Sequence, residues 1–383
     1  MKYVHIVQFH SRTGGGVGSV ITDLSQEMAK SCNQIYVVSL FKNEKIDFNE
    51  EIIWGKNNNI NVEIIQKNNM NKISVLMKLR KFIKDLSRVD DVCLFLHLKW
   101  GVLAGVIGSV GIKKIRRVEV YHSGYMKYKP QAFLCKPFIN HYISVSKEAK
   151  MQLIKWFHVR SDKITVIYNG VDVERIRAIA ENTKSSLEDD TAISLISVGR
   201  LSFEKGFLTP ITSYSILRKE NTLNNTTYTM VGEGPQMDEA RKISNGFIKF
   251  TGKIDRDDVY KVIAQSDIVI LPSLWEGNSI LLLEVLAIGK AVIVSDIPSF
   301  REVLHFEPLN KNEMIRIEQF GIVFQKDNID SCKYALECIS TIDYSVLQKM
   351  ALFSKSISDS FSIKTQAIKY FNIVDDSQVI KNN

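Results

Sequence analysis

The stretch DIVILPSLWEGNSILLLEVLAIGKAVIVSD, residues 267–296, contains a complete unit of parallel α/β structure. Its two ends are short, apolar and rich in β-branched residues, which is typical of buried strands. Between them, Ser279 or Asn278 can cap the start of a helix, and Gly289 can end it as a left-handed residue. Two strands joined by a helix predict a parallel sheet with helices on both faces.

The same alternation of short apolar runs and amphipathic stretches continues along the chain. The apolar runs are 3–9, 34–40, 92–98, 117–122, 141–146, 163–170, 193–199, 227–232, 247–252, 267–272 and 290–296. We therefore predict an α/β fold of two doubly wound Rossmann-like domains facing a cleft, followed by helices from about residue 327. The polar stretch 180–192 is the best candidate for a linker. Ligands of such sheets bind at the carboxyl ends of the strands.

The composition indicates an ordinary globular protein. The chain has 383 residues, of which 45% are hydrophobic and 24% charged. Its five cysteines form neither a CxxC pair nor a Cys/His cluster, which favours reduced thiols in a cytoplasmic protein and predicts no metal site. The first residues, MKYVHIVQFH, are too polar and too short for a secretory signal. Segment 92–112 carries His97 and Lys99, so a buried strand and helix explain it better than a membrane span.

Positive charge is concentrated in the first half of the chain. Residues 1–170 carry 26 Lys and Arg against 13 Asp and Glu, whereas the remainder carries 24 against 29. Segments 78–88 and 113–117 are the most basic, and the first belongs to an amphipathic helical pattern. An anionic membrane surface is therefore an expected partner, with solubility alone as the alternative. Nucleic acid is not expected, because no recognition motif accompanies the charge.

Two glutamates flank the start of the helix in the opening stretch. Glu276 lies in the loop before the helix, and Glu284 lies in its second turn. The free N–H groups of a helix N-terminus can bind a phosphate, and a carboxylate accepts hydrogen bonds from a pair of hydroxyl groups. A phosphate site with a carboxylate on either side suits a nucleotide sugar. The alternative is a helix on which Glu284 only faces solvent.

Two cations follow the strand at 193–199. Arg200 and Lys205 lie between this strand and the next helical stretch, where they can clamp a diphosphate. The alternative is a surface salt bridge with Glu204. The Arg-x4-Lys spacing alone does not decide between these interpretations.

Four weaker motifs also lie at strand ends. The loop 10–20 has three consecutive glycines that can expose N–H groups, but it does not match G-x-G-x-x-G. His122 ends a strand, where both a functional and a structural role fit a lone histidine. The segments YNGVD, 168–172, and VGEGP, 231–235, are turns when taken singly.

Taken in order, these motifs resemble those of the retaining glycosyltransferases of family four. The order is Gly-Gly loop, His122, YNGVD, VGRLSFEKG, VGEGP and EGNSILLLE followed by GKAVIVSD, and it spans about residues 4–304. The E-x7-E element, with the Arg/Lys pair before it, is the most specific part. The resemblance implies the GT-B fold, with 1–173 as an acceptor-binding domain and 174–360 as a nucleotide-sugar-binding domain. It also implies that 361–383 form a helix that crosses back to the first domain, plus a tail.

The resemblance further implies a role for each matched residue. Glu284 is expected to hold the ribose hydroxyls of the donor. Arg200 and Lys205 are expected to bind the diphosphate and to stabilise the charge that grows on it as the glycosidic bond breaks. The other implied donor contacts are Glu276 and His122 at the sugar, Asn278 and Ser279 at phosphate and sugar, Gly15 and Gly16 at the phosphates and acceptor, and Ile254 at the base.

The implied chemistry is a metal-independent, retaining transfer from a nucleoside-diphosphate sugar, with UDP as the commonest nucleotide of the family and no further cofactor. The departing phosphate oxygen is expected to help deprotonate the acceptor, and Glu276 as a covalent nucleophile is the alternative. Two positions depart from the family pattern: Gly18 replaces a glutamate, and Asn278 replaces an aromatic residue. The second departure leaves the identity of the donor sugar open.

We expect a glycosyltransferase that builds a bacterial surface polysaccharide such as capsule or O-antigen. Its acceptor would be a glycan or an undecaprenyl-diphosphate-linked molecule at the cytoplasmic face of the membrane. A nucleotide-sugar epimerase of the same fold and a non-catalytic nucleotide-sugar-binding subunit are the alternatives. A Rossmann dehydrogenase is disfavoured, because the third glycine is missing and no acidic residue ends the strand at 34–40.

Overall fold

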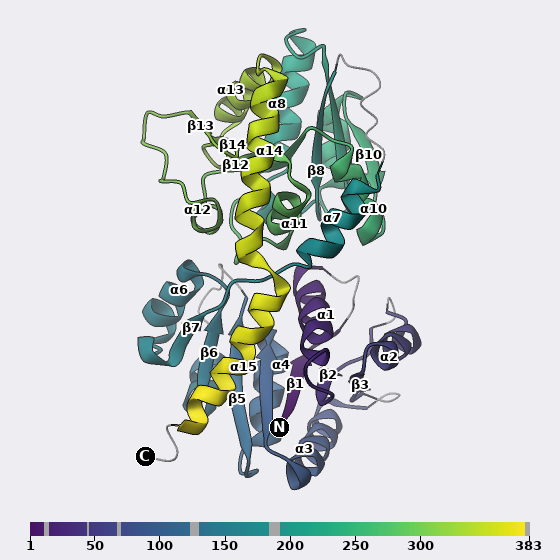
Figure 1. Ribbon diagram of the computed structural model, residues 1–383, viewed down its shortest axis with the longest axis vertical. Helices are drawn as coiled ribbons and strands as arrows, with labels where there is room; N and C mark the ends of the chain where they lie inside the picture. The colour runs from purple at the N-terminus through teal and green to yellow at the C-terminus, as the bar shows by residue number, and fades with distance from the viewer. Residues whose placement is uncertain (11–14, 44–45, 67–69, 123–129, 184–191, 380–383) are drawn as a thin grey trace. The chain divides into compact units, whose positions relative to one another are not determined.

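A computed structural model describes residues 1–10, 15–43, 46–66, 70–122, 130–183 and 192–379 (Figure 1). The chain forms two compact units: unit 1 comprises Met1–Val171 and Ile363–Asn383, and unit 2 comprises Asp172–Ser362. The boundaries expected from the sequence, after residues 173 and 360, each differ from these by two residues. Each unit contains its own sheet.

Unit 1 contains a parallel sheet with the strand order β3-β2-β1-β4-β5-β6-β7. The strands are β1 Lys2–Val7, β2 Ile35–Ser39, β3 Ile60–Ile64, β4 Val92–His97, β5 Ile115–Tyr121, β6 His141–Ser144 and β7 Ile164–Val166. The order reverses between β1 and β4, as in a Rossmann fold. The predicted strands in this half are present, but β3 was not predicted.

Helices cover both faces of this sheet. One face packs against α1 Gly16–Ala29, α2 Phe48–Asn57 and α15 Ile363–Val379. The other packs against α3 Lys72–Val89, α4 Leu98–Ser109, α5 Pro130–Cys135 and α6 Lys147–Phe157. Each face therefore has its own hydrophobic core, as expected for strands that are apolar on both sides.

The last helix, α15 (yellow in Figure 1), completes the core of unit 1. Tyr370 is fully buried, and its ring lies 5.0 Å from that of Phe95 on β4. Polar contacts also hold the helix, because Arg116 Nη1 donates to the carbonyl oxygen of Val374 at 3.0 Å. The helix thus belongs to unit 1 although it follows unit 2 in the sequence.

Unit 2 has a sheet in the order β10-β9-β8-β11-β12-β14-β13, parallel except for the β13–β14 pair. Its strands are β8 Ile193–Val198, β9 Thr226–Val231, β10 Lys249–Gly252, β11 Ile268–Leu271, β12 Ala291–Ser295, β13 Ile315–Glu318 and β14 Gly321–Phe324. The hairpin of β13 and β14 was not predicted, whereas the five other strands were.

The helices of unit 2 are α7 Val173–Glu181, α8 Leu208–Lys219, α9 Met237–Ser244, α10 Arg256–Ala264, α11 Ile280–Ile288, α12 Pro298–Leu304, α13 Ile329–Ser340 and α14 Tyr344–Ser358. Helices α8, α9 and α13 share one core with the sheet. Helices α7, α10 and α11 pack against one another. Short 3₁₀ turns occur at Lys136–Phe138, Ser161–Lys163, Phe203–Lys205 and Asp359–Phe361.

The interpretation of 180–192 as a linker between domains is wrong. Helix α7, which precedes this stretch, already belongs to unit 2. Arg177 on α7 donates to the carbonyl oxygen of Lys355 at 3.0 Å and to Asp359 Oδ1 at 2.8 Å, both at the end of α14. The stretch therefore connects α7 to β8 within unit 2, and residues 184–191 lie outside the described residues.

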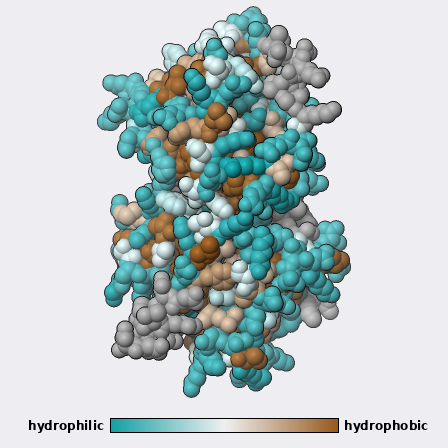
Figure 2. Space-filling view, in the orientation of Figure 1, coloured by the Kyte–Doolittle hydropathy of each residue, from teal (hydrophilic) through white to brown (hydrophobic). Residues whose placement is uncertain are grey.

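The apolar segment 92–112 forms β4 and α4, as expected from its charged residues. Among the described residues, no helix is long and apolar enough to cross a membrane. Figure 2 shows one face of the molecule, on which hydrophobic side chains lie in small patches among hydrophilic ones.

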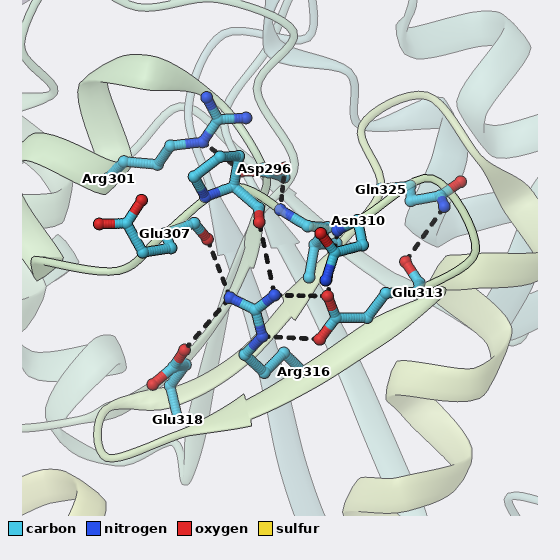
Figure 3. Close-up of polar contacts among 10 residues, drawn as sticks. Asp296, Arg301, Glu307, Asn310, Glu313, Arg316, Glu318 and Gln325 are labelled. Carbon is cyan, nitrogen blue, oxygen red and sulfur yellow. Dashed lines mark hydrogen bonds and ion pairs between the residues drawn. The ribbon is translucent and has the colours of Figure 1, made fainter.

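A network of ion pairs ties the loop between α12 and β13 to the end of β12 (Figure 3). Asp296, directly after β12, accepts a hydrogen bond from Arg301 at 2.6 Å. Arg316 on β13 pairs with Glu313 and donates to the carbonyl oxygen of Glu307 at 3.0 Å. These charges neutralise one another locally, so we assign the network a structural role.

Replacing Tyr370 with alanine should destabilise unit 1 by roughly 3–5 kcal/mol, because the cavity would lie in a fully buried core. The matched control is Ile368→Ala on the same helix, since Ile368 is exposed and should have little effect. Urea unfolding followed by tryptophan fluorescence measures both variants, and Trp54, Trp100 and Trp156 report on unit 1. Equal stability of the two variants would show that α15 does not complete the core.

Candidate functional site

In unit 2 the strand order reverses between β8 and β11, so a ligand is expected at the carboxyl ends of these two strands. Arg200 follows β8, and the loop containing Glu276 follows β11. Helix α11, which carries Glu284, begins directly after this loop. Sheet topology therefore brings the two most specific motifs of the sequence to one edge.

An ion pair joins these two motifs directly. Lys205 Nζ lies 2.5 Å from Glu276 Oε1, and Ser273 Oγ donates to the same oxygen at 2.9 Å. The loops are also linked through the backbone, because Leu274 N donates to the carbonyl oxygen of Glu204 at 2.9 Å. Lys205 thus pairs with Glu276 and not with Glu204, so the salt-bridge alternative is wrong for this residue.

Arg200 is exposed, and its charge acts on Glu204. Its neighbour Glu204 accepts a hydrogen bond from Ser202 Oγ at 2.5 Å. Burial raises the pKa of Glu204, but this hydrogen bond and the nearby charges of Lys205 and Arg200 outweigh burial and lower its pKa overall. The turn therefore presents two cations beside a carboxylate that stays ionised at neutral pH.

The segment VGEGP positions the turn that carries Arg200. Gly232 has φ +126°, and a Cβ atom there would lie 1.9 Å from the carbonyl oxygen of Gly199. A Cβ atom at Gly234 would lie 2.2 Å from the carbonyl oxygen of Leu201. Only glycine allows this close approach of two backbones. The segment is thus more than a turn, because it packs against the residues on either side of Arg200.

Glu284 is buried on α11 and does not face solvent, so the solvent-facing alternative is wrong. Its Oε1 accepts hydrogen bonds from Arg256 Nη2 at 2.8 Å, from Arg256 Nε at 3.1 Å and from Tyr260 OH at 2.7 Å. All three bonds fall on one oxygen of the carboxylate. Sequence reasoning missed Arg256 and Tyr260, although their i,i+4 spacing places both on one face of α10.

The remaining predicted residues of unit 2 lie around the start of α11 and α10. Ser279 is the N-cap of α11, with its Oγ 3.5 Å from Leu282 N, and Asn278 precedes it in a buried position. Ile254 lies between β10 and α10, two residues before Arg256. Contact between Arg256 and Glu284 therefore brings the Ile254 segment close to α11.

In unit 1, Gly15 and Gly16 begin helix α1. Gly15 is the N-cap with φ +91°, and its carbonyl oxygen accepts a hydrogen bond from Ser19 N at 3.1 Å. A Cβ atom at either glycine would meet no atom of the described residues within 4 Å, so no close packing among them requires these glycines. Gly14 and the preceding part of the loop lie outside the described residues.

His122 is not a lone histidine. Its Nε2 lies 2.9 Å from His97 Nδ1, and His97 Nε2 lies 3.0 Å from His5 Nδ1. Burial lowers the pKa of His122 to about 4 and that of His5 to about 3, and it holds the pKa of His97 well below its usual value. All three are therefore neutral at pH 7. Sequence reasoning missed the role of His5 and His97. Each is a histidine inside an apolar run that was predicted to be a strand, and this was the signal that could have found them.

Two family descriptions match consecutive parts of the chain. Glycosyltransferase Family 4 matches residues 14–175, and Glycosyl transferases group 1 matches residues 178–307. The chain belongs to this family of glycosyltransferases. Its fold is accordingly that of two Rossmann-like sheets of the GT-B class.

Known proteins similar to this family member include both bacterial and archaeal ones. An uncharacterized glycosyltransferase of Methanocaldococcus jannaschii is 30% identical over 42% of this chain and 42% of its own length. UDP-Gal:alpha-D-GlcNAc-diphosphoundecaprenol alpha-1,3-galactosyltransferase of Escherichia coli is 27% identical over 63% of this chain and 58% of its own length. The chain thus spans about half the length of these curated relatives.

Among solved structures, Anabaena HepE in complex with UDP and glucose has a TM-score of 0.76 to this chain. The sequence identity is 16%, and the alignment covers 98% of this chain and 100% of HepE. At this identity the likeness concerns the fold alone.

Acid should destabilise the protein through its buried histidines. Because the pKa of His5 falls from 6.5 to about 3 on folding, the unfolded chain binds a proton below pH 6.5 that the folded chain does not. For such a histidine, the free energy of unfolding should therefore fall by about 1.4 kcal/mol for each unit by which the pH is lowered in this range. In His5→Phe, urea unfolding should show a correspondingly shallower pH dependence between about pH 6 and about pH 5. An equal slope in both proteins would contradict the neutral state of His5.

Proposed function

We propose that this protein is a retaining glycosyltransferase that moves a sugar from a nucleoside-diphosphate sugar to an acceptor hydroxyl. The observation that carries this proposal is the contact between the Lys205 and Glu276 motifs at the carboxyl ends of β8 and β11. Unit 2 would bind the donor, and unit 1 would bind the acceptor. Neither donor binding nor acceptor binding requires a metal in this proposal, because the cations that contact the diphosphate are side chains.

The diphosphate would bind at Arg200 and Lys205. Arg200 is exposed and can meet two phosphate oxygens with its planar guanidinium. Lys205 would exchange part of its contact with Glu276 for a phosphate oxygen. Negative charge grows on the leaving diphosphate as the glycosidic bond breaks, so both cations would stabilise the transition state more than the bound donor.

The ribose would bind at Glu284. Arg256 and Tyr260 donate hydrogen bonds to Oε1 of this buried carboxylate, which orients Oε2. A carboxylate oxygen held in this way can accept hydrogen bonds from the ribose hydroxyls. Ile254 would lie at the base, and Asn278 and Ser279 would cover the phosphates and the sugar.

The transfer would proceed on one face of the sugar. The bond between C1 and the phosphate oxygen breaks, the acceptor oxygen forms the new bond to C1, and the acceptor proton moves to the departing phosphate oxygen. Glu276 is a weaker candidate for a covalent nucleophile, because Lys205 and Ser273 already occupy its Oε1. In this proposal Glu276 orients the sugar hydroxyls, and His122 donates a hydrogen bond to the sugar.

We propose UDP as the nucleotide and a glycan or undecaprenyl-diphosphate-linked molecule as the acceptor, in capsule or O-antigen synthesis at the cytoplasmic face of the membrane. Two similar proteins support this proposal: the E. coli relative is a UDP-Gal:alpha-D-GlcNAc-diphosphoundecaprenol galactosyltransferase, and HepE forms a complex with UDP and glucose. Gly15 and Gly16 would contact the phosphates and the acceptor.

A stripe on α3 supports contact with an anionic membrane. Ile73, Met77, Lys81, Lys84 and Arg88 follow the spacing of one helix face and are all exposed. Two large hydrophobic residues are followed by three cations, as at a membrane surface. The other basic segment contributes less than its sequence indicates. Its two arginines donate hydrogen bonds inside unit 1, and only its two lysines are exposed.

Nucleotide binding tests the donor site. UDP at about 100 times its dissociation constant should raise the free energy of unfolding by about 2.7 kcal/mol, whereas GDP and ADP should raise it less. Glu284→Gln should lose this stabilisation, and the control Glu239→Gln, an exposed acid on α9, should keep it. Calorimetry and thermal unfolding measure both. The donor assignment fails if no nucleotide binds the wild-type protein.

Vesicle binding tests the membrane surface. The double variant K81E/K84E should bind anionic vesicles more than tenfold more weakly than wild type, because each lysine near such a surface contributes about 1 kcal/mol. The control K311E/K326E changes the net charge equally on exposed lysines of unit 2. Sedimentation with phosphatidylglycerol vesicles at low and high salt measures both. If both variants lost vesicle binding equally, net charge alone would explain the binding, and α3 would not be a docking surface.

A further inference from the structure

Three histidines form a diagonal series across neighbouring strands of unit 1. On β1, His5 lies in register with Phe95, and His97 is two residues further along β4. His97 in turn lies in register with Val120, and His122 is two residues further, just past β5. Residues two apart on a strand point to the same side, so all three side chains share one face of the sheet. The ring centroids are 5.2 Å apart at both steps.

The hydrogen bonds of this series require a defined arrangement of protons. Burial keeps the three rings neutral, so they carry three N–H protons in total. Each of the two bonds between rings uses one proton, and the third must lie at one end of the series. The possible ends are His5 Nε2 and His122 Nδ1.

The two ends differ in their surroundings. His5 is fully buried, and its Nε2 has no hydrogen-bond partner among the described residues. His122 is partly exposed. A buried N–H group without an acceptor is rarer and more costly than a lone pair without a donor. The third proton therefore belongs on His122 Nδ1. In this arrangement His5 Nδ1–H donates to His97 Nε2, and His97 Nδ1–H donates to His122 Nε2.

We propose that His5 and His97 are positioning residues that set the tautomer of His122, so that His122 presents an Nδ1–H donor at the carboxyl end of β5. Such a group binds an oxygen acceptor, such as a hydroxyl oxygen, and cannot act as a general base. In the proposed function, on which this last step rests, the acceptor is a hydroxyl oxygen of the donor sugar. The series thus fixes which nitrogen of each ring is the donor, and it does so without carrying a charge.

His10 is a further titratable group that acts on the series. It lies 3.4 Å from Glu51 on α2 and is buried with it. A positive charge on His10 disfavours protonation of His5 and His97 and so lowers the pKa of both. This neighbour therefore helps to keep the series neutral.

Nitrogen NMR of the full chain tests the tautomer directly. The chain has seven histidines, so a selectively ¹⁵N-histidine-labelled sample gives few signals, and single substitutions assign them. At neutral pH, His122 should show a protonated-type shift at Nδ1 and an unprotonated-type shift at Nε2, with the same pattern in His97 and His5. The opposite pattern, or a doubly protonated His122, would overturn the proposal.

Two substitutions at His97 test whether the series causes this tautomer. His97→Phe removes the donor to His122, and both His122 nitrogens should then show averaged shifts. His97→Asp supplies only an acceptor, and the His122 proton should move to Nε2. His141, whose Nε2 lies 2.9 Å from Thr165 Oγ1, reports in the same spectrum whether unit 1 stays folded. An unchanged His122 tautomer in a folded variant would refute the role of His97, and His5→Phe repeats the test if neither variant folds.

Ligand affinity separates this inference from the proposed function. In His97→Phe the dissociation constant of a UDP-sugar should rise about tenfold, the effect of losing one hydrogen bond, while that of UDP should stay constant. Unchanged affinity for the UDP-sugar despite an altered tautomer would overturn the contact to the sugar. If wild type binds no nucleotide, the proposed function fails, and the NMR result still decides the tautomer.

Discussion

Parallel strand pairing is the constraint on which the rest of this structure depends. It brings the carboxyl ends of all strands in a doubly wound sheet to one edge, so residues far apart in the sequence meet there. In unit 2 this constraint joins Lys205 to Glu276 across 71 positions of chain. In unit 1 it aligns His5, His97 and His122 on three neighbouring strands. The histidine series follows from strand register, whereas the Lys205–Glu276 pair also depends on the loops that follow β8 and β11.

The polar groups at these edges are held by partners of different kinds. Glu284 is buried, yet three hydrogen bonds from Arg256 and Tyr260 compensate for the loss of water around one of its oxygens. The histidines are instead kept neutral by burial, and their mutual hydrogen bonds limit the protons to two arrangements. In the proposed function, such a site would present ordered donors and acceptors to a ligand before the ligand arrives, which is the condition for electrostatic stabilisation of a transition state.

Much of the fold could be predicted from local patterns, because most strands are buried on both faces and appear as apolar runs. Strand β3, INVEI, was missed because it alternates with polar residues, and the hairpin of β13 and β14 was missed because its first strand carries Arg316 and Glu318. The polar stretch after α7 was misread as a linker, since composition does not show that Arg177 ties α7 to α14. Capping was more reliable: Ser279 and Gly289 delimit α11 as predicted, because their backbone chemistry is local.

The sequence by itself determined the order of elements, the limits of α11 and the identity of the residues that match the family, since these depend on short-range patterns and spacing. Only the tertiary structure decided which partners these residues have. Lys205 binds Glu276 and not its neighbour Glu204, Glu284 is buried against Arg256, and His122 ends a series of three histidines. The physical reason is that each of these contacts joins separate elements of the fold, and their proximity is set by sheet register and helix packing, which no local pattern contains.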